Sequence, residues 1–255
     1  MPHPPRRLVA GVALVLSGSL AGVGCAGGDP DASVVSASVS ATAVLDPAAL
    51  VTNGINEGTA DEAISRARDA LLAASSFRVA GSPSRGAPLD LVYSSEEDLV
   101  GSQGTVTQSE STFELLAVNA DIYVRGNLDW LAEAIAEEAP RTLGESWLLL
   151  PAAAGADLAV FADPQLLVDS LLVPQGPVRS VGVSLIDGQP ALGVQYVDSE
   201  ATVWVAGDGE PYPVLVERLG ATATDGVLRL TAFNADVELA PPPADQVVIV
   251  DDAVE

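Results

Sequence analysis

Two blocks of alternating apolar and polar residues constrain the fold of this chain more than any other feature. Residues 77–126 hold five short segments of this kind, including "PLDLVYS" and "TFELLAV", and residues 178–233 hold five more, including "VRSVGVSL" and "VLRLTAF". Successive side chains of a β-strand point to opposite faces, and the Gly-, Asn- and Asp-containing stretches between the segments are typical of turns. Each block therefore predicts an antiparallel meander.

Helical patterns precede and separate the two blocks. Thr59-Ala-Asp-Glu62 is a capping box that opens a helix to about Ser76, residues 127–140 form a second helix, and Asp163-Pro164 starts a third. With the strand predicted from "ESWLLLP", the sheet has about 11 strands, which is more than a flat twisted sheet usually tolerates. We expect an α+β fold with one large antiparallel sheet, curled into a half-barrel, and helices against its concave face.

A sheet of this shape encloses space, and its inward-facing apolar side chains would line that space. Alternation alone does not distinguish a cavity wall from a packed core, so the core interpretation stays open for each residue. Aliphatic walls suit flexible acyl chains better than flat aromatic ligands. The candidate ligand-binding residues are Leu91, Tyr93, Phe113, Leu115, Ile122, Val124, Leu192, Val194, Trp204, Val214, Val216, Leu228 and Leu230.

The N-terminal segment has the features of an export signal. Arg6 and Arg7 precede an apolar run, residues 8–20, and small residues then lead to Cys25, the only cysteine. We expect a signal peptide at residues 1–24. "GVGC" resembles the lipobox of bacterial lipoproteins, although Gly22 stands where Leu is usual. It predicts that Cys25 is lipidated, and two acyl chains suffice for stable anchoring. The alternative is an ordinary cleaved signal and a soluble secreted protein.

The rest of the chain divides by composition into three parts. Residues 25–58 contain the lipidated cysteine and a segment rich in Ser, Ala, Val and Thr, which is typical of a flexible tether. Residues 59–250 hold the predicted helices and strands and form the folded domain. Residues 251–255 form a short acidic tail.

The residue types that are missing exclude several function classes. The only histidine, His3, lies in the signal peptide, and the chain has no lysine. Ser–His and Cys–His nucleophiles, His-rich zinc sites and lysine-dependent phosphate loops are therefore excluded from the mature domain. The formal net charge of −24 opposes nucleic-acid binding. We expect no nucleic-acid partner, no metal and no cofactor.

Carboxylate pairs remain as a route to catalysis, as in glycosidases. Adjacent acids are more often solvated turns or helix ends, and no complete calcium loop surrounds the acids after Gly207. The sequence therefore predicts no catalytic residue and a protein that is not an enzyme. The acidic groups considered are Glu96-Glu97-Asp98, Glu137-Glu138 and Asp208 with Glu210.

Several phrases carry a resemblance to a known family. "ALLAASSFRVAG", "ADIYVRG", "ESWLLLP", "GEPYPVLVE" and "APPPADQVV", together with the lipoprotein signal and tether, are similar to the LppX/LprAFG-type lipoproteins of actinobacteria and to the broader LolA-like carriers. The resemblance covers nearly all of residues 59–250. It implies a half-barrel sheet with helices over an apolar cavity that carries acyl chains across the envelope, and it transfers no catalytic residue.

Two functions follow from the sequence. The first is a lipoprotein, anchored on the outer face of the cell membrane by an N-terminal diacylglycerol, that binds acyl chains of a lipid or glycolipid in an apolar cavity and shuttles it across the envelope. Its expected partners are the lipid ligand and the membrane, with a membrane transporter as a further candidate. The alternative is an envelope lipoprotein that acts as a sensor, scaffold or accessory subunit through its acidic surface.

Overall fold

The computed structural model describes residues 46–84, 87–96, 98–108, 110–127, 146–151, 155–222 and 225–249. The predicted signal peptide, Cys25, residues 26–45 of the tether, the helix predicted at residues 128–140 and the acidic tail lie outside these residues. These residues all belong to one compact unit of the chain, which begins at Val44.

One mixed sheet of 12 strands forms the body of this unit, in the order β12-β6-β5-β4-β3-β2-β1-β11-β10-β9-β8-β7. Every neighbouring pair is antiparallel except β12 and β6, which are parallel. The strands are β1 (Ser76–Ser82), β2 (Leu89–Glu96), β3 (Leu99–Gln108), β4 (Ser111–Val118), β5 (Asp121–Gly126), β6 (Trp147–Leu149), β7 (Val178–Ile186), β8 (Gln189–Tyr196), β9 (Ala201–Ala206), β10 (Pro213–Thr222), β11 (Asp225–Thr231) and β12 (Val247–Ile249).

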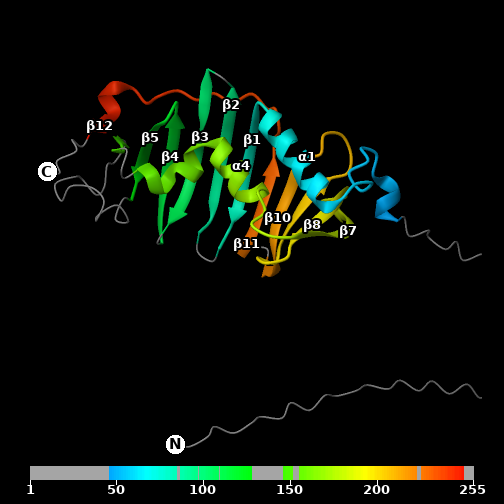
Figure 1. Ribbon diagram of the computed structural model, residues 1–255. Helices are drawn as coiled ribbons and strands as arrows, with labels where there is room; N and C mark the ends of the chain where they lie inside the picture. Colours follow the sequence, from blue (N-terminus) through cyan, green and yellow to red (C-terminus); the bar gives the residue numbers. More distant parts are fainter. Residues whose placement is uncertain are drawn as a thin grey trace, which may run out of the picture. The chain divides into compact units, whose positions relative to one another are not determined.

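The sheet confirms the predicted fold class. Both meanders form, and β1 joins them by pairing with β2 on one side and β11 on the other. The sheet wraps around the helices without closing, because β12 and β7 are its free edges (Figure 1). The twelfth strand and its parallel pairing were not predicted. They arise because residues 232–246 return from β11 along the sheet to β6 before β12 begins.

Helices α1 (Ala60–Ala73) and α4 (Pro164–Leu172) lie against one face of the sheet (Figure 1). The Thr59 hydroxyl accepts a hydrogen bond from the Glu62 backbone N–H at 3.2 Å, and Glu62 accepts one from the Thr59 N–H at 2.7 Å, which confirms the capping box. Helix α1 ends at Ala73, before the predicted Ser76, because Ser76 already belongs to β1.

Helix α4 starts at the predicted cap. The Asp163 carboxylate accepts hydrogen bonds from the backbone N–H groups of Gln165 and Leu166, and Pro164 occupies the first turn, where its missing N–H costs nothing. The shorter helical elements are η1 (Pro47–Leu50), η3 (Ala156–Leu158), α3 (Ala159–Ala162) and η4 (Ala244–Gln246).

The two faces of the sheet differ in their covering. We call the face under α1 and α4 the helical face and the opposite one the outer face. On the helical face, strand residues such as Val79 and Leu91 pack with Ile64 and Leu71 of α1 and Val168 of α4 in one continuous core. On the outer face a smaller cluster contains Leu116, Val118, Tyr123 and Leu239. Leu239 comes from the C-terminal segment, which therefore covers part of the outer face.

Candidate functional site

Most of the helical face is filled by packed side chains. Eleven of the thirteen candidate residues lie on it, because their registers place them on the same side as Val79 and Val203. Ile122 and Val216 are half-buried there, and the other nine are buried in the core. Over most of this face the core interpretation is therefore the one the structure supports. The nine buried residues are Leu91, Tyr93, Phe113, Leu115, Val124, Leu192, Val194, Leu228 and Leu230.

Trp204 is on the outer face, which corrects its assignment to the cavity. It pairs with Gly193 and Leu215, whereas its neighbours Val203 and Val205 point into the core. A Cβ added to Gly193 would lie 2.9 Å from the Trp204 ring, so the indole packs directly over that glycine. Residues 203–205 are all apolar, so alternation in β9 did not identify the core face.

Val214 does not line the same pocket as Val216. The pairing of β10 with β9 shifts register between Pro213 and Leu215, and Val214 lies in this irregularity. It lines a separate pocket of about 240 Å³ together with Ala191 and Ala206. A bulge interrupts the regular alternation of a strand, and here Val214 and Val216 line different pockets.

The helical face opens to solvent beside the C-terminal half of α4. The opening is an apolar pocket of about 240 Å³, located where β1 ends and β11 begins. Leu171 of α4, Tyr196 of β8, Val216 of β10 and Leu228 of β11 provide its apolar wall. We call it the α4 pocket. Its remaining lining residues are Pro83, Ser170, Ser199, Ala201, Glu217, Arg218 and Gly226.

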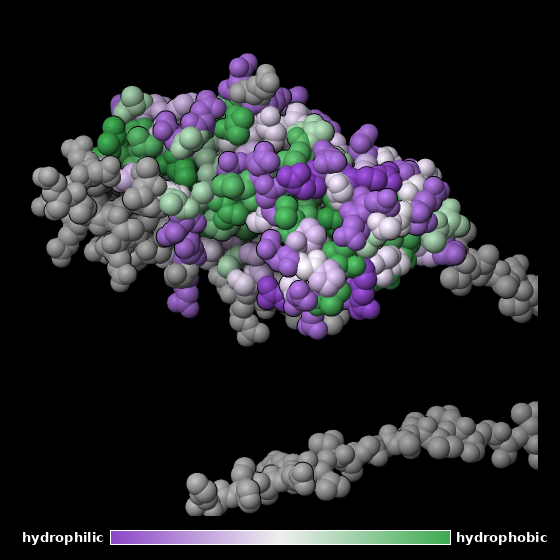
Figure 2. All heavy atoms as spheres, in the orientation of Figure 1, coloured by the Kyte–Doolittle hydropathy of each residue, from purple (hydrophilic) through white to green (hydrophobic). Residues whose placement is uncertain are grey.

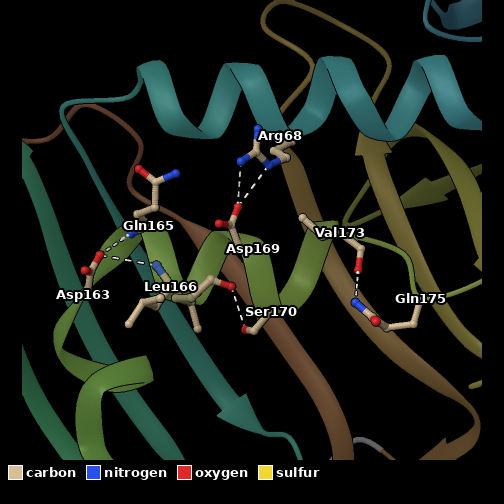
Figure 3. Close-up of polar contacts among 9 residues, drawn as sticks. Arg68, Asp163, Gln165, Leu166, Asp169, Ser170, Val173 and Gln175 are labelled. Atoms are coloured by element: carbon tan, nitrogen blue, oxygen red, sulfur yellow. Dashed lines mark hydrogen bonds and ion pairs between the residues drawn. The ribbon is translucent and has the colours of Figure 1, made fainter. Parts of the chain in front are cut away.

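Two polar contacts hold α4 over this pocket. Arg68 of α1 donates from Nε and Nη2 to Asp169 Oδ1 at 3.1 and 2.8 Å, and Figure 3 shows these side chains pointing toward each other across the gap between the helices. The Tyr196 hydroxyl donates to the Leu171 carbonyl at 2.9 Å. Burial raises the pKa of Tyr196 above its ordinary value, so this hydroxyl keeps its proton.

The solvent side of α4 is partly apolar. Leu166 is 45% exposed, and Val173, just after the helix, is 41% exposed. In Figure 2 apolar surface gathers at the position that α4 occupies in Figure 1, between hydrophilic regions.

The core contains one polar atom without a partner near the far end of β1. The Tyr93 hydroxyl is fully buried and has no hydrogen bond within the described residues. Its ring stacks on Phe77, with the centroids 5.0 Å apart. Desolvation raises the pKa of Tyr93, so the hydroxyl is neutral and can both donate and accept. Unpaired buried hydroxyls are rare in native proteins, so this one needs an explanation.

Sequence reasoning missed Tyr196 and Arg218 at the α4 pocket. Tyr196 continues the alternation of Leu192 and Val194, and Arg218 continues that of Val216. The same period of two could have found both residues. The prediction stopped at apolar aliphatic positions and so left out the amphipathic residues at the strand ends.

None of the described acids considered for catalysis, Glu96, Asp98, Asp208 and Glu210, lines this pocket. Glu96 and Asp98 are exposed at the β2–β3 hairpin, and the Asp208 carboxylate accepts a hydrogen bond from the Thr52 hydroxyl in the turn after β9. Glu97, Glu137 and Glu138 lie outside the described residues. Within the described ranges no group of three or more His, Cys, Asp or Glu residues is placed to hold a metal ion. No helix in those ranges is both long and apolar enough to span a membrane.

Comparison with known proteins finds likeness in structure alone. No protein-family model matches the chain, and neither does any curated protein. Among solved structures, LprF from Mycobacterium bovis aligns over 72% of this chain and 99% of its own, with 13% identity and a TM-score of 0.48. The Mycobacterium tuberculosis lipoprotein LppX aligns over 71% and 98%, with 17% identity and a TM-score of 0.45.

The Pseudomonas aeruginosa MucA/MucB complex aligns over 73% of this chain and 59% of the matched one, with 19% identity and a TM-score of 0.34. The LprF and LppX matches cover nearly the whole of those two proteins. The chain is thus similar in structure to two mycobacterial lipoproteins of the group that its sequence resembles, at low sequence identity.

Proposed function

We propose that this protein is an envelope lipoprotein, anchored to the outer face of the cell membrane through Cys25, that binds acyl chains of a lipid or glycolipid beneath α4 and carries it across the envelope. A non-catalytic binding role is part of the proposal. The observation that carries it is the α4 pocket, an apolar opening that leads into an almost wholly aliphatic core.

The chemistry of the pocket suits an acyl chain. Each CH₂ group that leaves water contributes about 0.8 kcal/mol, so a chain needs a dry groove and few placed polar groups. The α4 pocket supplies Leu171, Val216 and Leu228 as such a surface. Flexible aliphatic side chains also rearrange more readily around a flexible ligand than aromatic ones do.

The volume of the pocket requires α4 to move. About 240 Å³ is smaller than the roughly 300–1,000 Å³ of typical small-molecule sites. Helix α4 has nine residues, and the side-chain contacts that tie it to α1 and the sheet include one ion pair and one hydrogen bond. We expect α4 to lift from the sheet as the chain enters, with Leu167 and Val168 leaving part of the core.

The Tyr93 hydroxyl gives an entering ligand a polar contact. Phe77, beside Tyr93, is the second residue of β1, and Pro83, at the pocket, follows the end of that strand, so about 20 Å of strand separates the two positions. A long acyl chain that runs along β1 brings its far end near the hydroxyl. In a lipid with more than one acyl chain, an ester or hydroxyl oxygen of another chain would form a hydrogen bond with the Tyr93 hydroxyl.

The packed core favours a second candidate function. If α4 does not lift, the α4 pocket is too small for a long chain, and the protein acts through its surface, as a sensor, scaffold or accessory subunit. Binding of a fluorescent fatty acid to the full chain carrying Cys25→Ser distinguishes the two. Saturable binding supports the carrier, and its absence supports the surface role.

Two substitutions in one strand make this test specific. Val216→Trp fills the α4 pocket, whereas Val214→Trp places the same side chain two residues away, in the separate pocket. We expect Val216→Trp to abolish fatty-acid binding and Val214→Trp to retain it, with thermal unfolding confirming that both variants fold. Equal binding by the two variants would place the ligand elsewhere.

The anchor has its own test. Cys25→Ser should release the full chain from membranes into the soluble fraction, because the diacylated residue is lost. A Cys25→Ser variant that stays with the membrane contradicts the anchor and leaves acyl binding to be judged separately.

A further inference from the structure

Among the arginines that the structure describes, Arg218 alone has no hydrogen-bond or ion-pair partner within the described residues. Six of the seven described arginines are hydrogen-bonded or ion-paired. Acids outnumber bases 35 to 11 in the chain, so an arginine without an acidic partner is unexpected. For Arg218 no hydrogen bond or ion pair is present within the described residues. The six others and their partners are Arg66 with the carbonyls of Asn53 and Gly54, Arg68 with Asp169, Arg78 with Asp90, Arg125 with Glu114, Arg179 with Gln195, and Arg229 with Asp187.

This unpaired cation lines the α4 pocket at its rim. Arg218 follows Val216 by two residues in β10 and so lies on the same side of the strand, next to the apolar wall. Ser170 and Ser199 line the same pocket. Ser170 already donates to the Leu167 carbonyl at 2.7 Å, so its oxygen remains as an acceptor.

Three described acids lie close to Arg218 in the chain or in the neighbouring turn, and none of them pairs with it: Glu217, and Asp198 and Glu200 of the β8–β9 turn. Glu217 accepts a hydrogen bond from Trp204 Nε1 at 2.8 Å, on the outer face. Asp198, in the β8–β9 turn, lies against Gly176, where an added Cβ would be 2.1 Å from its Oδ2 atom. Arg218 is exposed and is not paired with any described acid, so its guanidinium is available to an external anion.

We propose that the α4 pocket selects amphiphiles with a negatively charged headgroup, and that Arg218 is the residue that binds this charge. This inference rests on the proposed acyl-chain function and adds the class of lipid. A guanidinium presents parallel N–H donors that match a carboxylate or a phosphate, and binds either more strongly than a neutral acceptor. With the tail beneath α4, the headgroup of a bound amphiphile emerges beside Arg218.

Two sources supply this chemistry, the carboxylate of a fatty acid and the phosphate of an anionic phospholipid. The test measures three probes on the full chain carrying Cys25→Ser at low ionic strength: palmitate, phosphatidylglycerol and diacylglycerol. The last two carry matched acyl chains and differ in charge. Preference for palmitate assigns the carboxylate, and preference for phosphatidylglycerol assigns the phosphate.

Arg218→Gln is the informative variant, and Arg179→Gln is its matched control, since Arg179 lies in β7 and is bound to Gln195. We expect Arg218→Gln to weaken binding of the preferred anion about tenfold, to leave diacylglycerol binding unchanged and to remove the salt dependence. Arg179→Gln should change none of these. Arg218→Lys should retain part of the preference, because it keeps the charge and loses the planar fork.

Different results would contradict acyl-chain binding and headgroup selection by Arg218. If wild-type protein binds diacylglycerol as tightly as both anions, or if Arg218→Gln matches Arg179→Gln, headgroup selection by Arg218 is wrong and acyl binding stands. If none of the three probes binds, the carrier function itself is wrong, and the inference fails with it.

Discussion

The helical and outer faces of the sheet are built from alternate residues of the same strands, yet they are stabilised in different ways. The helical face is a continuous aliphatic core under α1 and α4. The outer face carries cross-strand ion pairs, such as Arg78 with Asp90 and Arg125 with Glu114, and a local apolar cluster under the C-terminal segment. The first face therefore holds most of the stability, and the second holds most of the polar contacts that pH and salt can alter.

The largest expected effect compares neighbouring residues on the two faces. Leu91 is fully buried on the helical face, and Val92, the next residue of β2, is half-buried on the outer face. Leu91→Ala should lower the free energy of unfolding by about 2–5 kcal/mol because it leaves a cavity. Val92→Ala should lower it by about 1 kcal/mol or less. Urea unfolding of both variants measures the contrast, and equal losses would contradict the assignment of faces.

The second prediction compares the hydroxyls of two tyrosines, Tyr93, which is buried, and Tyr196, which is half-buried. Tyr93 has no hydrogen-bond partner within the described residues, and Tyr196 donates to α4. Removing an unpaired buried hydroxyl removes its desolvation penalty, so Tyr93→Phe should raise the free energy of unfolding by about 1 kcal/mol. Tyr196→Phe should lower it by about 1 kcal/mol, since the Leu171 carbonyl loses its donor.

Measuring lipid binding by Tyr93→Phe gives a further test of the role of its hydroxyl. If the Tyr93 hydroxyl contacts a bound lipid, Tyr93→Phe should also weaken binding of an ester-containing probe more than that of palmitate. A destabilised Tyr93→Phe variant would show that the hydroxyl has a partner in solution, such as a buried water.

The third prediction concerns the ion pair between α1 and α4. The side chains of Arg68 and Asp169 are 31% and 38% exposed, so Asp169→Asn should cost only about 0.2–1 kcal/mol of stability. If α4 lifts during binding, the same substitution should speed release of a fluorescent fatty acid, measured by stopped flow. An unchanged release rate would mean that α4 is not the moving element.

The smallest effect lies on the outer face and depends on pH. The hydrogen bond from Arg78 lowers the pKa of the Asp90 carboxyl, so the pair stabilises the fold above the unfolded pKa of about 4. That contribution is lost as the pH falls through the folded pKa of Asp90. Both side chains are 45% exposed, so it amounts to about 1 kcal/mol at most.

Comparison with Asp90→Asn measures this contribution. The difference in free energy of unfolding between wild type and Asp90→Asn should be larger at pH 5.5 than at pH 3, and ligand release should not change. A difference that grows as the pH falls would have the wrong sign for this ion pair.

Much of the architecture was predictable because its signals are local. The Thr59 capping box and the Asp163 cap act within one helical turn. Alternation placed Leu91, Leu115 and Val194 on one face of their strands as candidates for a cavity wall, and the structure packs that face into the core. The assignments of Trp204 and Val214 to the cavity failed for local reasons too. Strand β9 is apolar on both sides of Trp204, and Val214 lies in a register shift that interrupts the alternation of β10.

The sequence by itself determined the antiparallel sheet, the start of α1 and α4, and which faces of most strands are buried, because these depend on residues a few positions apart. Only the tertiary structure decided the parallel pairing of β12 and the site of the α4 pocket. That pocket joins Pro83, Leu171, Tyr196 and Leu228, which are far apart along the chain. The place of Arg218 at this pocket, with no partner among the described residues, was likewise decided only by the tertiary structure, because it depends on residues of other strands.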